Sequence, residues 1–492
     1  MFRCTYRNEV VRVDLGVEPL VQLEWGLYAF VPALPALRHL ADGRYAVPAV
    51  AGTVPPPPSL VDLPDAGGEP APEVMAAKLQ MESRGSRAKA WAAAAAAASQ
   101  THRPVNQGAY GWLVGATDDV RTVLGDDGSR FSASGYGQRM RDSLGLGFLG
   151  QDDVGSHAGH GADWVEAVNR VVEDFGRGGA AFDAARRAAQ AVIEAGFLAI
   201  PAGLPQRWTA DIEALSMRVI ARLCAEWFGL PDAAGQLMGV GGPEAAASPK
   251  AQCPIHFLNL SRHVFSPHPR QVVEATAPGD GRKVHEAVRA HLAARAGLER
   301  QPADLTAAML DALDRVEGVD AEVRASTVAG IMLGFPGTVF GNLVNVMMHW
   351  QSSRRLWDLQ LRWRRLERAG PLDARRARAA FEADLLAAMR EDTVPHAVWR
   401  VAATDAPCGW AGVRAGDKVV VGLGAALTPD GRNDDLIFGG ARPGAPGGHG
   451  PTRHACSGRD LALDTMLGLF AALWGAGELR PDTDPRRVIV VR

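Results

Sequence analysis

The sequence predicts a mainly α-helical protein with a minor β portion, an α+β class with one long helix through its core. Long stretches between residues 161 and 390 repeat apolar residues at helical spacing, which favours helices. Short β-branched runs follow only after residue 396, which places most strands near the end of the chain. Hydrophobic residues make up 47% of the 492, so the chain can bury a large core.

Composition narrows the classes of partner. The formal net charge is -3, so no global basic field exists to attract nucleic acid, and we expect no nucleic-acid partner. The five cysteines contain no C-x-x-C pair and no zinc-like spacing, which is typical of a reducing compartment and predicts a cytoplasmic protein. They are Cys4, Cys224, Cys253, Cys408 and Cys456.

No membrane partner is expected either. The most apolar run near the N-terminus, residues 20–40, is interrupted by Glu24, Pro32, Pro35 and Arg38. It therefore falls short of the ~20 clean apolar residues that a membrane-spanning helix needs. The first ten residues also lack the shape of a signal peptide.

Two regions are expected in the chain. Residues 1–70 form an N-terminal extension of unknown role, with a proline-rich, extended stretch from Val54 to Pro64. Residues 71–492 form a single domain, which begins with an alanine-rich helical pattern over 73–100.

Within this domain the elements follow in order. Residues 108–115 read as a strand and 117–124 as a helix, with Thr117 as its N-cap. Further helices are predicted over 161–175, 180–195, 208–228, 254–263, 280–298, 303–315, 321–352, 373–390 and 460–475. Further strands are predicted over 396–402, 418–423 and 487–492. Residues 438–450 are dense in Gly and Pro and form a loop.

The helix over 321–352 is unusual in its length. About thirty residues at 1.5 Å each span roughly 45 Å, more than the diameter of a small domain. Apolar residues surround much of its circumference, so we expect it to run through the core.

The most specific chemical signal is the segment GGHGPTRHACSGRDLAL, Gly447 to Leu463. Cys456 ends a glycine-rich loop just before an apolar helix that starts near Gly458. A helix N-terminus offers free N–H groups and a positive dipole end, which favour a thiolate and lower a thiol pKa. Cys456 is therefore predicted as a thiolate ligand to a metal.

This segment resembles the cysteine loop of the cytochrome P-450 family, F-x-x-G-x-(R/H)-x-C-x-G. His454 matches the basic position, Cys456 the ligand to the haem iron, and Gly458 the last glycine. His449 stands where the family has Phe, which normally covers the thiolate, and Thr452 stands where it has the first Gly.

The resemblance covers roughly residues 70–492 and implies a cytochrome P-450-like fold, with the long helix lying over the haem. It also implies haem b as the cofactor. Arg400, in the strand after the helix that ends at Arg390, resembles the arginine that meets a haem propionate. His454 and His157 are further propionate candidates.

Two family signatures are altered. In the E-x-x-R motif Arg390 is present, but Ala387 occupies the glutamate position, and Glu382 lies eight residues away, outside the spacing of helical neighbours. On the long helix, the pattern (A/G)-G-x-(D/E)-T keeps Thr338 but has Gly337 in place of the acid that organises proton delivery. Pro336 should kink the helix there, and Asn342, one turn on, could hold an oxygen substituent of a ligand.

The function expected from the resemblance is a haem-thiolate oxidoreductase, a monooxygenase or peroxygenase that oxidises a small organic substrate. Its partners would be that substrate and either an external ferredoxin or flavodoxin reductase system or peroxide. One alternative is a non-redox haem-thiolate isomerase or dehydratase that acts on a hydroperoxide or another activated O–O or N–O bond. A second alternative is a haem-binding protein without catalysis.

Overall fold

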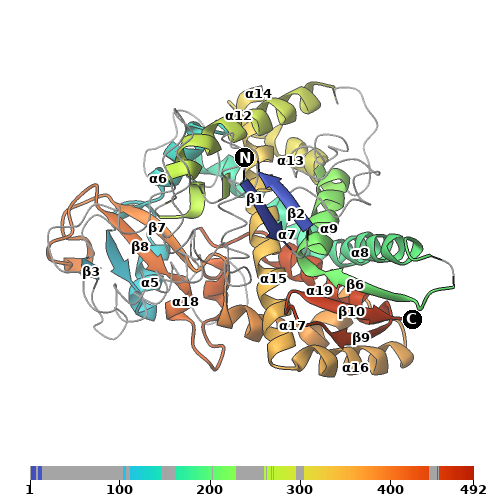
Figure 1. The fold of residues 1–492 in the computed structure, drawn as a ribbon. Helices are drawn as coiled ribbons and strands as arrows, with labels where there is room; N and C mark the ends of the chain where they lie inside the picture. Colours follow the sequence, from blue (N-terminus) through green and yellow to red (C-terminus); the bar gives the residue numbers. More distant parts are fainter. Residues whose placement is uncertain are drawn as a thin grey trace.

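The computed structural model describes residues 2–6, 9–13, 104–106, 111–145, 150, 161–201, 203–228, 260–261, 263–267, 269, 271–294, 304–442, 452 and 454–492. Figure 1 shows a helical part and a smaller β part at one side of it, with helix α15 (Pro336–Ser352) running down the middle. The α+β class predicted from the sequence is confirmed.

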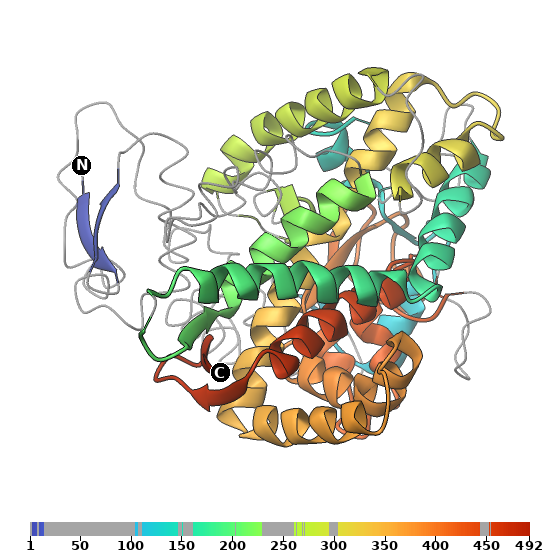
Figure 2. The ribbon, with the colours of Figure 1, turned by 90° about the vertical axis from the view of Figure 1, so that its right-hand side faces the viewer.

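The centre of the helical part is α19 (Arg459–Gly475), whose middle is buried all round. It packs closely against α8 (Ala180–Leu198), and Figure 2 shows the two helices side by side. A Cβ on Gly468 would lie 2.3 Å from the carbonyl oxygen of Phe182, so this glycine allows the backbones of the two helices to approach. The pairing fixes where α19, and the loop before it, begins.

The predicted long central helix is present and is broken where Pro336 predicted a kink. Helix α14 (Ala321–Gly334) ends at Phe335, and α15 begins with Pro336 in its first turn. Pro336 has no N–H and cannot continue the hydrogen-bond ladder. By length and composition the stretch Ala321–Ser352 could cross a membrane, but 83% of its most apolar window is buried, as expected for a core helix.

Two sheets of the described chain flank the helices. The larger has the order β3 (Val105–Asn106), β4 (Trp112–Val114), β8 (Lys418–Gly422), β7 (Ala397–Ala402) and β5 (Phe131–Ser132). Its β7–β8 pair is antiparallel and places Arg400 opposite Val419. The smaller has the order β6 (Arg207–Asp211), β10 (Arg487–Val491) and β9 (Glu478–Pro481). A further hairpin joins β1 (Phe2–Tyr6) and β2 (Glu9–Val13).

The remaining elements have the following bounds. The α-helices are α5 (Thr117–Leu124), α6 (Ser134–Arg141), α7 (Gly161–Arg177), α9 (Ile212–Phe228), α12 (Gln271–Ala294), α13 (Leu305–Leu313), α16 (Arg355–Arg368), α17 (Ala374–Glu391) and α18 (Leu423–Ala426). Two short 3-10 helices are η5 (Pro407–Gly409) and η6 (Asp434–Phe438).

Three sequence expectations needed correction. The helix predicted over 208–228 begins as strand β6, because those residues pair with β10 from the far end of the chain. Thr117 is not an N-cap: Ala116 holds that position, and the Thr117 hydroxyl donates to the carbonyl oxygen of Ala426. Helix α16 was not predicted, although Leu356, Leu359 and Trp363 give it an apolar stripe. The stretch 254–259 of the helix predicted over 254–263, most of the proposed extension 1–70, and residues 73–100 lie outside the described residues.

We predict that Gly468→Ala lowers the free energy of unfolding by about 1–3 kcal/mol, because the added methyl group forces α19 and α8 apart. Thermal unfolding checks this. Gly475 ends the same helix with nothing within 4 Å of its Cβ position, so Gly475→Ala should be neutral or stabilising by up to about 1 kcal/mol. Equal effects of the two substitutions would contradict the close packing.

Candidate functional site

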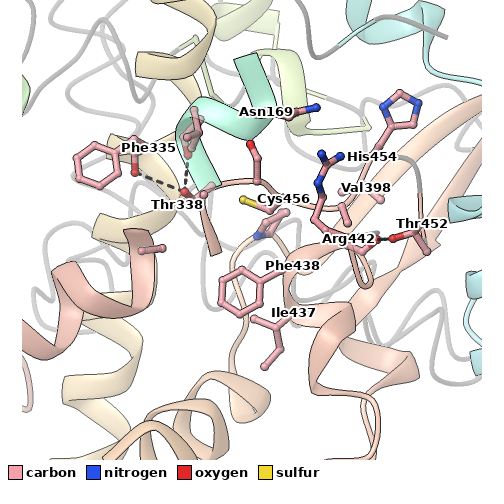
Figure 3. Close-up of a pocket in the computed structure, with 18 of the residues that line it drawn as sticks. Asn169, Phe335, Thr338, Val398, Ile437, Phe438, Arg442, Thr452, His454 and Cys456 are labelled. Atoms are coloured by element: carbon pink, nitrogen blue, oxygen red, sulfur yellow. Dashed lines mark hydrogen bonds between the residues drawn. The ribbon is translucent and has the colours of Figure 1, made fainter. Parts of the chain in front are cut away.

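A cavity of about 710 Å³ lies where the break in the central helix faces the loop before α19. Its walls come from α7, from the α14–α15 junction, from β7 and from residues 437–439 and 454–458. Figure 3 shows these walls with Thr338 at the α14–α15 junction and Cys456 in the loop. Most lining side chains are apolar, with a few polar groups among them, as is typical of a cofactor or ligand site.

Cys456 lies deep in the molecule, yet protein atoms leave its side chain uncovered toward the cavity. Its backbone N–H donates to the carbonyl oxygen of Phe438 at 2.8 Å, which fixes the loop three residues before α19 begins. A buried structural cysteine would be packed on all sides, so the open sulfur indicates a ligand-binding role.

The electrostatics of this thiol differ from the sequence expectation. Burial raises the pKa of Cys456 above its usual value. A hydrogen bond from the Gly458 backbone N–H and the positive charges of Arg442 and Arg459 act in the opposite direction, as predicted for this loop, but they do not outweigh burial. The neutral thiol is therefore favoured in the absence of a further positive charge beside the sulfur.

Phe438 lies beside the cysteine loop, because its carbonyl oxygen accepts the backbone N–H of Cys456. Besides the Phe438–Cys456 hydrogen bond, a Cβ on Gly439 would lie 3.6 Å from the carbonyl oxygen of His454. The chain leaves after Ala441 and returns at Thr452, whose N–H donates to the carbonyl oxygen of Ala441 at 2.8 Å. The sequence Phe438-Gly439-Gly440 could have indicated that this segment lies near the cysteine. The residues between Gly440 and Cys456 made that relation hard to recognise.

Thr452 stands where the family has a glycine, and the structure shows how it is accommodated. Its hydroxyl donates to the carbonyl oxygen of Gly439 at 2.8 Å. Gly440 lies opposite with φ +109°, and a Cβ there would meet the Thr452 hydroxyl oxygen at 2.0 Å. The absence of a side chain at Gly440 therefore leaves room for Thr452.

The other residues predicted from the cysteine loop have different outcomes. His454 is half-buried and lines the cavity. Gly458 is the N-cap of α19, and a Cβ there would make only ordinary contact, 3.7 Å from the Cys456 sulfur. His157 and His449 lie outside the described residues, so the propionate role of His157 stays a prediction.

Arg400 of β7 is buried, at 4% exposure, and lines the cavity. Its guanidinium donates to the carbonyl oxygen of Trp399 at 2.8 Å and lies 5.5 Å from the centroid of the Tyr136 ring. Within the described chain no carboxylate forms an ion pair with it. Because a buried charge is stabilised only by an opposite one, the cavity beside Arg400 is suited to an anionic group.

Thr338, Gly337 and Pro336 lie on the opposite wall. The Thr338 hydroxyl donates to the carbonyl oxygen of Gly334, four residues earlier, at 2.6 Å, so its proton is engaged within the helix. Gly337 contributes no side chain, and no acidic residue of α14 or α15 lines the cavity in the described part.

Asn342 also lines the cavity, but it is not free to hold a ligand by its amide. Its Nδ2 donates to the carbonyl oxygens of Thr338 at 3.0 Å and Val394 at 2.9 Å, and its Oδ1 accepts from the Val394 N–H at 3.1 Å. We therefore correct its predicted catalytic role: Asn342 fastens the segment before β7 to the central helix.

Asn169 of α7 is a polar residue that the sequence analysis missed. It is 8% exposed and lines the cavity, and no hydrogen bond to its amide is found within the described chain. Figure 3 shows its amide at the same pocket as His454 and Arg442. Its signal was weak, because an asparagine within an amphipathic helix is usually a surface residue.

Arg390, left without its usual glutamate by Ala387, has a different partner. Its guanidinium donates to both carboxylate oxygens of Asp434 at 2.9 and 3.0 Å. Gly431, with φ +76°, allows the approach, since a Cβ there would lie 2.4 Å from Arg390 Nη1. The end of α17 is thus tied to η6, just before Phe438.

Comparisons by sequence find no matching family model and no matching curated protein. Comparisons by structure find many similar chains. CalO2 is 21% identical, with a TM-score of 0.50 over 81% of this chain and 95% of its own. P450BioI, in a complex with an acyl carrier protein carrying hexadec-9Z-enoic acid, is 13% identical, with a TM-score of 0.53 over 80% and 96%. The cytochrome P450DA heme domain is 13% identical, with a TM-score of 0.53 over 76% and 85%.

We predict that Asn342→Leu lowers the free energy of unfolding by about 1–3 kcal/mol, because the N–H and carbonyl of Val394 lose their partner inside the protein. Chemical denaturation checks this. Asn345 makes a single bond, from its Nδ2 to the carbonyl oxygen of Asp392, so Asn345→Leu should cost only about 1 kcal/mol. If both substitutions were neutral, the fastening role of Asn342 would be wrong.

Proposed function

We propose, for a chain that has the cytochrome P-450 fold, that the protein is a haem-thiolate oxidoreductase which oxidises a small organic substrate as a monooxygenase or peroxygenase. The carrying observation is the uncovered sulfur of Cys456, deep in a cavity whose other polar groups include the buried guanidinium of Arg400. A thiolate ligand for the iron and a cation for a propionate, in one apolar cavity, suit the binding of haem b.

The residues present fit that cofactor. Cys456 supplies a soft ligand for the iron. The described residues contain no cluster of three or more His, Cys, Asp and Glu side chains that could hold a metal ion. Arg400 and His454 supply polar contacts for carboxylates, and the amide of Asn169 supplies a further donor. The apolar walls near Leu461 and Met466 suit a flat hydrophobic ring.

Bound here, haem would supply the oxidising power, while the protein supplies ligand, orientation and exclusion of water. Cys456 would hold the iron, and the Gly458 N–H together with Arg442 and Arg459 would stabilise the negative sulfur. Phe438 keeps the loop in register by accepting the Cys456 N–H.

The wall across from Cys456 is suited to an apolar substrate. Ile331, Phe335 and Val339 present hydrophobic side chains from the central helix, and Val398 and Phe265 add two more. These side chains exclude water and favour a substrate held mainly by shape and hydrophobic contact.

The residues that would deliver protons in a monooxygenase are altered on the central helix. Thr338 donates its proton to Gly334 at 2.6 Å, and Gly337 offers no acid beside it. A reaction driven by dioxygen needs protons delivered to the reacting oxygen, whereas peroxide brings its own. This arrangement supports peroxide as the oxidant, with an external ferredoxin or flavodoxin reductase system as the other route.

The same observation favours one second candidate, a non-redox isomerase or dehydratase that acts on a hydroperoxide or another activated O–O or N–O bond. Such a reaction needs neither electrons nor the missing acid. Three measurements distinguish these reactions. A monooxygenase consumes reductant and dioxygen, and a peroxygenase consumes hydrogen peroxide. The isomerase or dehydratase rearranges a hydroperoxide and consumes neither. A protein that binds haem and turns over none of these would be a non-catalytic haem protein. We further propose a cytoplasmic location, without a nucleic-acid or membrane partner.

We predict that the reduced protein with carbon monoxide shows a strongly red-shifted Soret band, and that Cys456→Ala abolishes it, because the substitution removes the sulfur ligand. Absorption spectroscopy of purified protein checks this. The matched control is Cys408→Ala, since Cys408 lies in η5 and does not line the cavity. A Soret band typical of a neutral protein ligand to the iron in the unaltered protein, or no haem binding at all, would contradict the proposed haem-thiolate function.

We predict that Arg400→Leu weakens haem binding by about tenfold to a hundredfold, because one charge-assisted hydrogen bond contributes about 1.5–3 kcal/mol. The haem-free protein should become more stable, since a buried charge without a carboxylate partner is removed. Haem titration measures the change in affinity, and thermal unfolding of the haem-free protein measures the change in its stability. Unchanged haem affinity with a less stable haem-free protein would mean that Arg400 serves the fold instead.

A further inference from the structure

Four charged side chains form a closed ring between the first half of α17 and the start of α19. Arg459 donates to Glu382 at 2.7 Å and to Asp460 at 3.0 Å. Arg378 donates to the same Asp460 oxygen at 2.8 Å and lies 3.9 Å from the other oxygen of Glu382. We call these four residues the Arg378–Glu382–Arg459–Asp460 ring.

Arg378 anchors the ring in the core. It donates to Asp464 at 2.5 Å and to the carbonyl oxygen of Asp460 at 2.7 Å. Asp464 is 1% exposed, and burial raises its pKa even though Arg378 acts to lower it. A hydrogen-bonded pair this deep holds the first turn of α19 in a defined position relative to α17.

Arg459 connects this ring to the cysteine loop. It is the third residue after Cys456, and its guanidinium lies 5.6 Å from the centroid of the Phe438 ring, a cation–π distance. Phe438 in turn accepts the Cys456 N–H at 2.8 Å. The chain of contacts therefore runs from Glu382 through Arg459 and Phe438 to the cysteine.

The charge of Arg459 also acts on the sulfur directly. Arg459 is the first residue of α19, three positions after Cys456, and its guanidinium places a positive charge beside the cysteine loop. Glu382 opposes Arg459 at 2.7 Å, so it reduces the positive field that the sulfur experiences. The arginine and the glutamate therefore act on the sulfur with opposite signs.

Resting on the proposed haem-thiolate function, we propose that Arg459, oriented by Glu382, is a positioning residue that holds Phe438 against the Cys456 loop and stabilises the negative sulfur. It does so in a chain in which the carboxylate at position 387 is absent and Arg390 pairs with Asp434 instead. Glu382, which contacts the first residue of α19, lies five residues before the position of the missing glutamate, about one and a half helical turns away.

The test measures the midpoint reduction potential of the haem-loaded protein and the fraction of its reduced carbon monoxide complex that keeps the red-shifted band. Glu382→Gln keeps the shape and one acceptor but removes the negative charge, so the potential should become more positive. Arg459→Gln removes the positive charge and the contact with Phe438, so the potential should become more negative and the red-shifted fraction should fall. Arg459→Lys keeps the charge, so its potential should stay near that of the unaltered protein while the red-shifted fraction falls.

Glu367→Gln is the matched control, because the Arg186–Glu367 pair joins α8 to α16 at 3.1 Å away from the cysteine loop. It should leave the potential and the spectrum unchanged. Shifts of the same sign in Glu382→Gln and Arg459→Gln, or none in either, would overturn the inference while the unaltered protein still shows the red-shifted band. Absence of that band in the unaltered protein would instead overturn the proposed function. If Arg459→Gln does not fold, Glu382→Gln and Arg459→Lys still decide between these outcomes.

Discussion

The structure depends on keeping one sulfur atom deep inside the protein and yet uncovered. Burial raises the pKa of the Cys456 thiol, so a free thiolate is disfavoured at this place. The Gly458 N–H and the positive charges of Arg442 and Arg459 act in the opposite direction and favour the charged sulfur. A single hydrogen bond between the Cys456 N–H and Phe438 sets the position of the loop, and the elements around it hold that bond in place.

Packing and charge share this work. Helix α19 is fixed along its length by its close approach to α8 at Gly468, and at its start by the pair of Arg378 with the buried Asp464. The first interaction is hydrophobic and steric, and it sets the axis of the helix. The second is directional, and it sets where the first turn, and so the cysteine loop, lies relative to α17. Neither interaction alone would determine both the axis of α19 and the position of its first turn.

The break in the central helix gives the opposite wall its chemistry. Pro336 interrupts the hydrogen-bond ladder, and the Thr338 hydroxyl just after it donates to the carbonyl oxygen of Gly334. The hydroxyl is thus engaged within the helix. Asn342, one turn on, is used in the same way to hold Val394. Both side chains therefore form hydrogen bonds within the protein, and this supports the proposal of peroxide or of a substrate that carries its own activated oxygen.

The sequence by itself determined the elements with strong periodicity and the helical break at Pro336, because both follow from local chemistry. It did not determine strand β6, which forms only because β10 arrives from the far end of the chain. It also did not reveal that Phe438 lies beside the cysteine loop, because the two residues are 18 positions apart and only folding brings them together. The partners of Arg390 and Glu382 were equally hidden, because ion pairs between distant segments depend on where the backbone carries each charge. Only the tertiary structure decided which polar side chains face the cavity and which form hydrogen bonds within its walls.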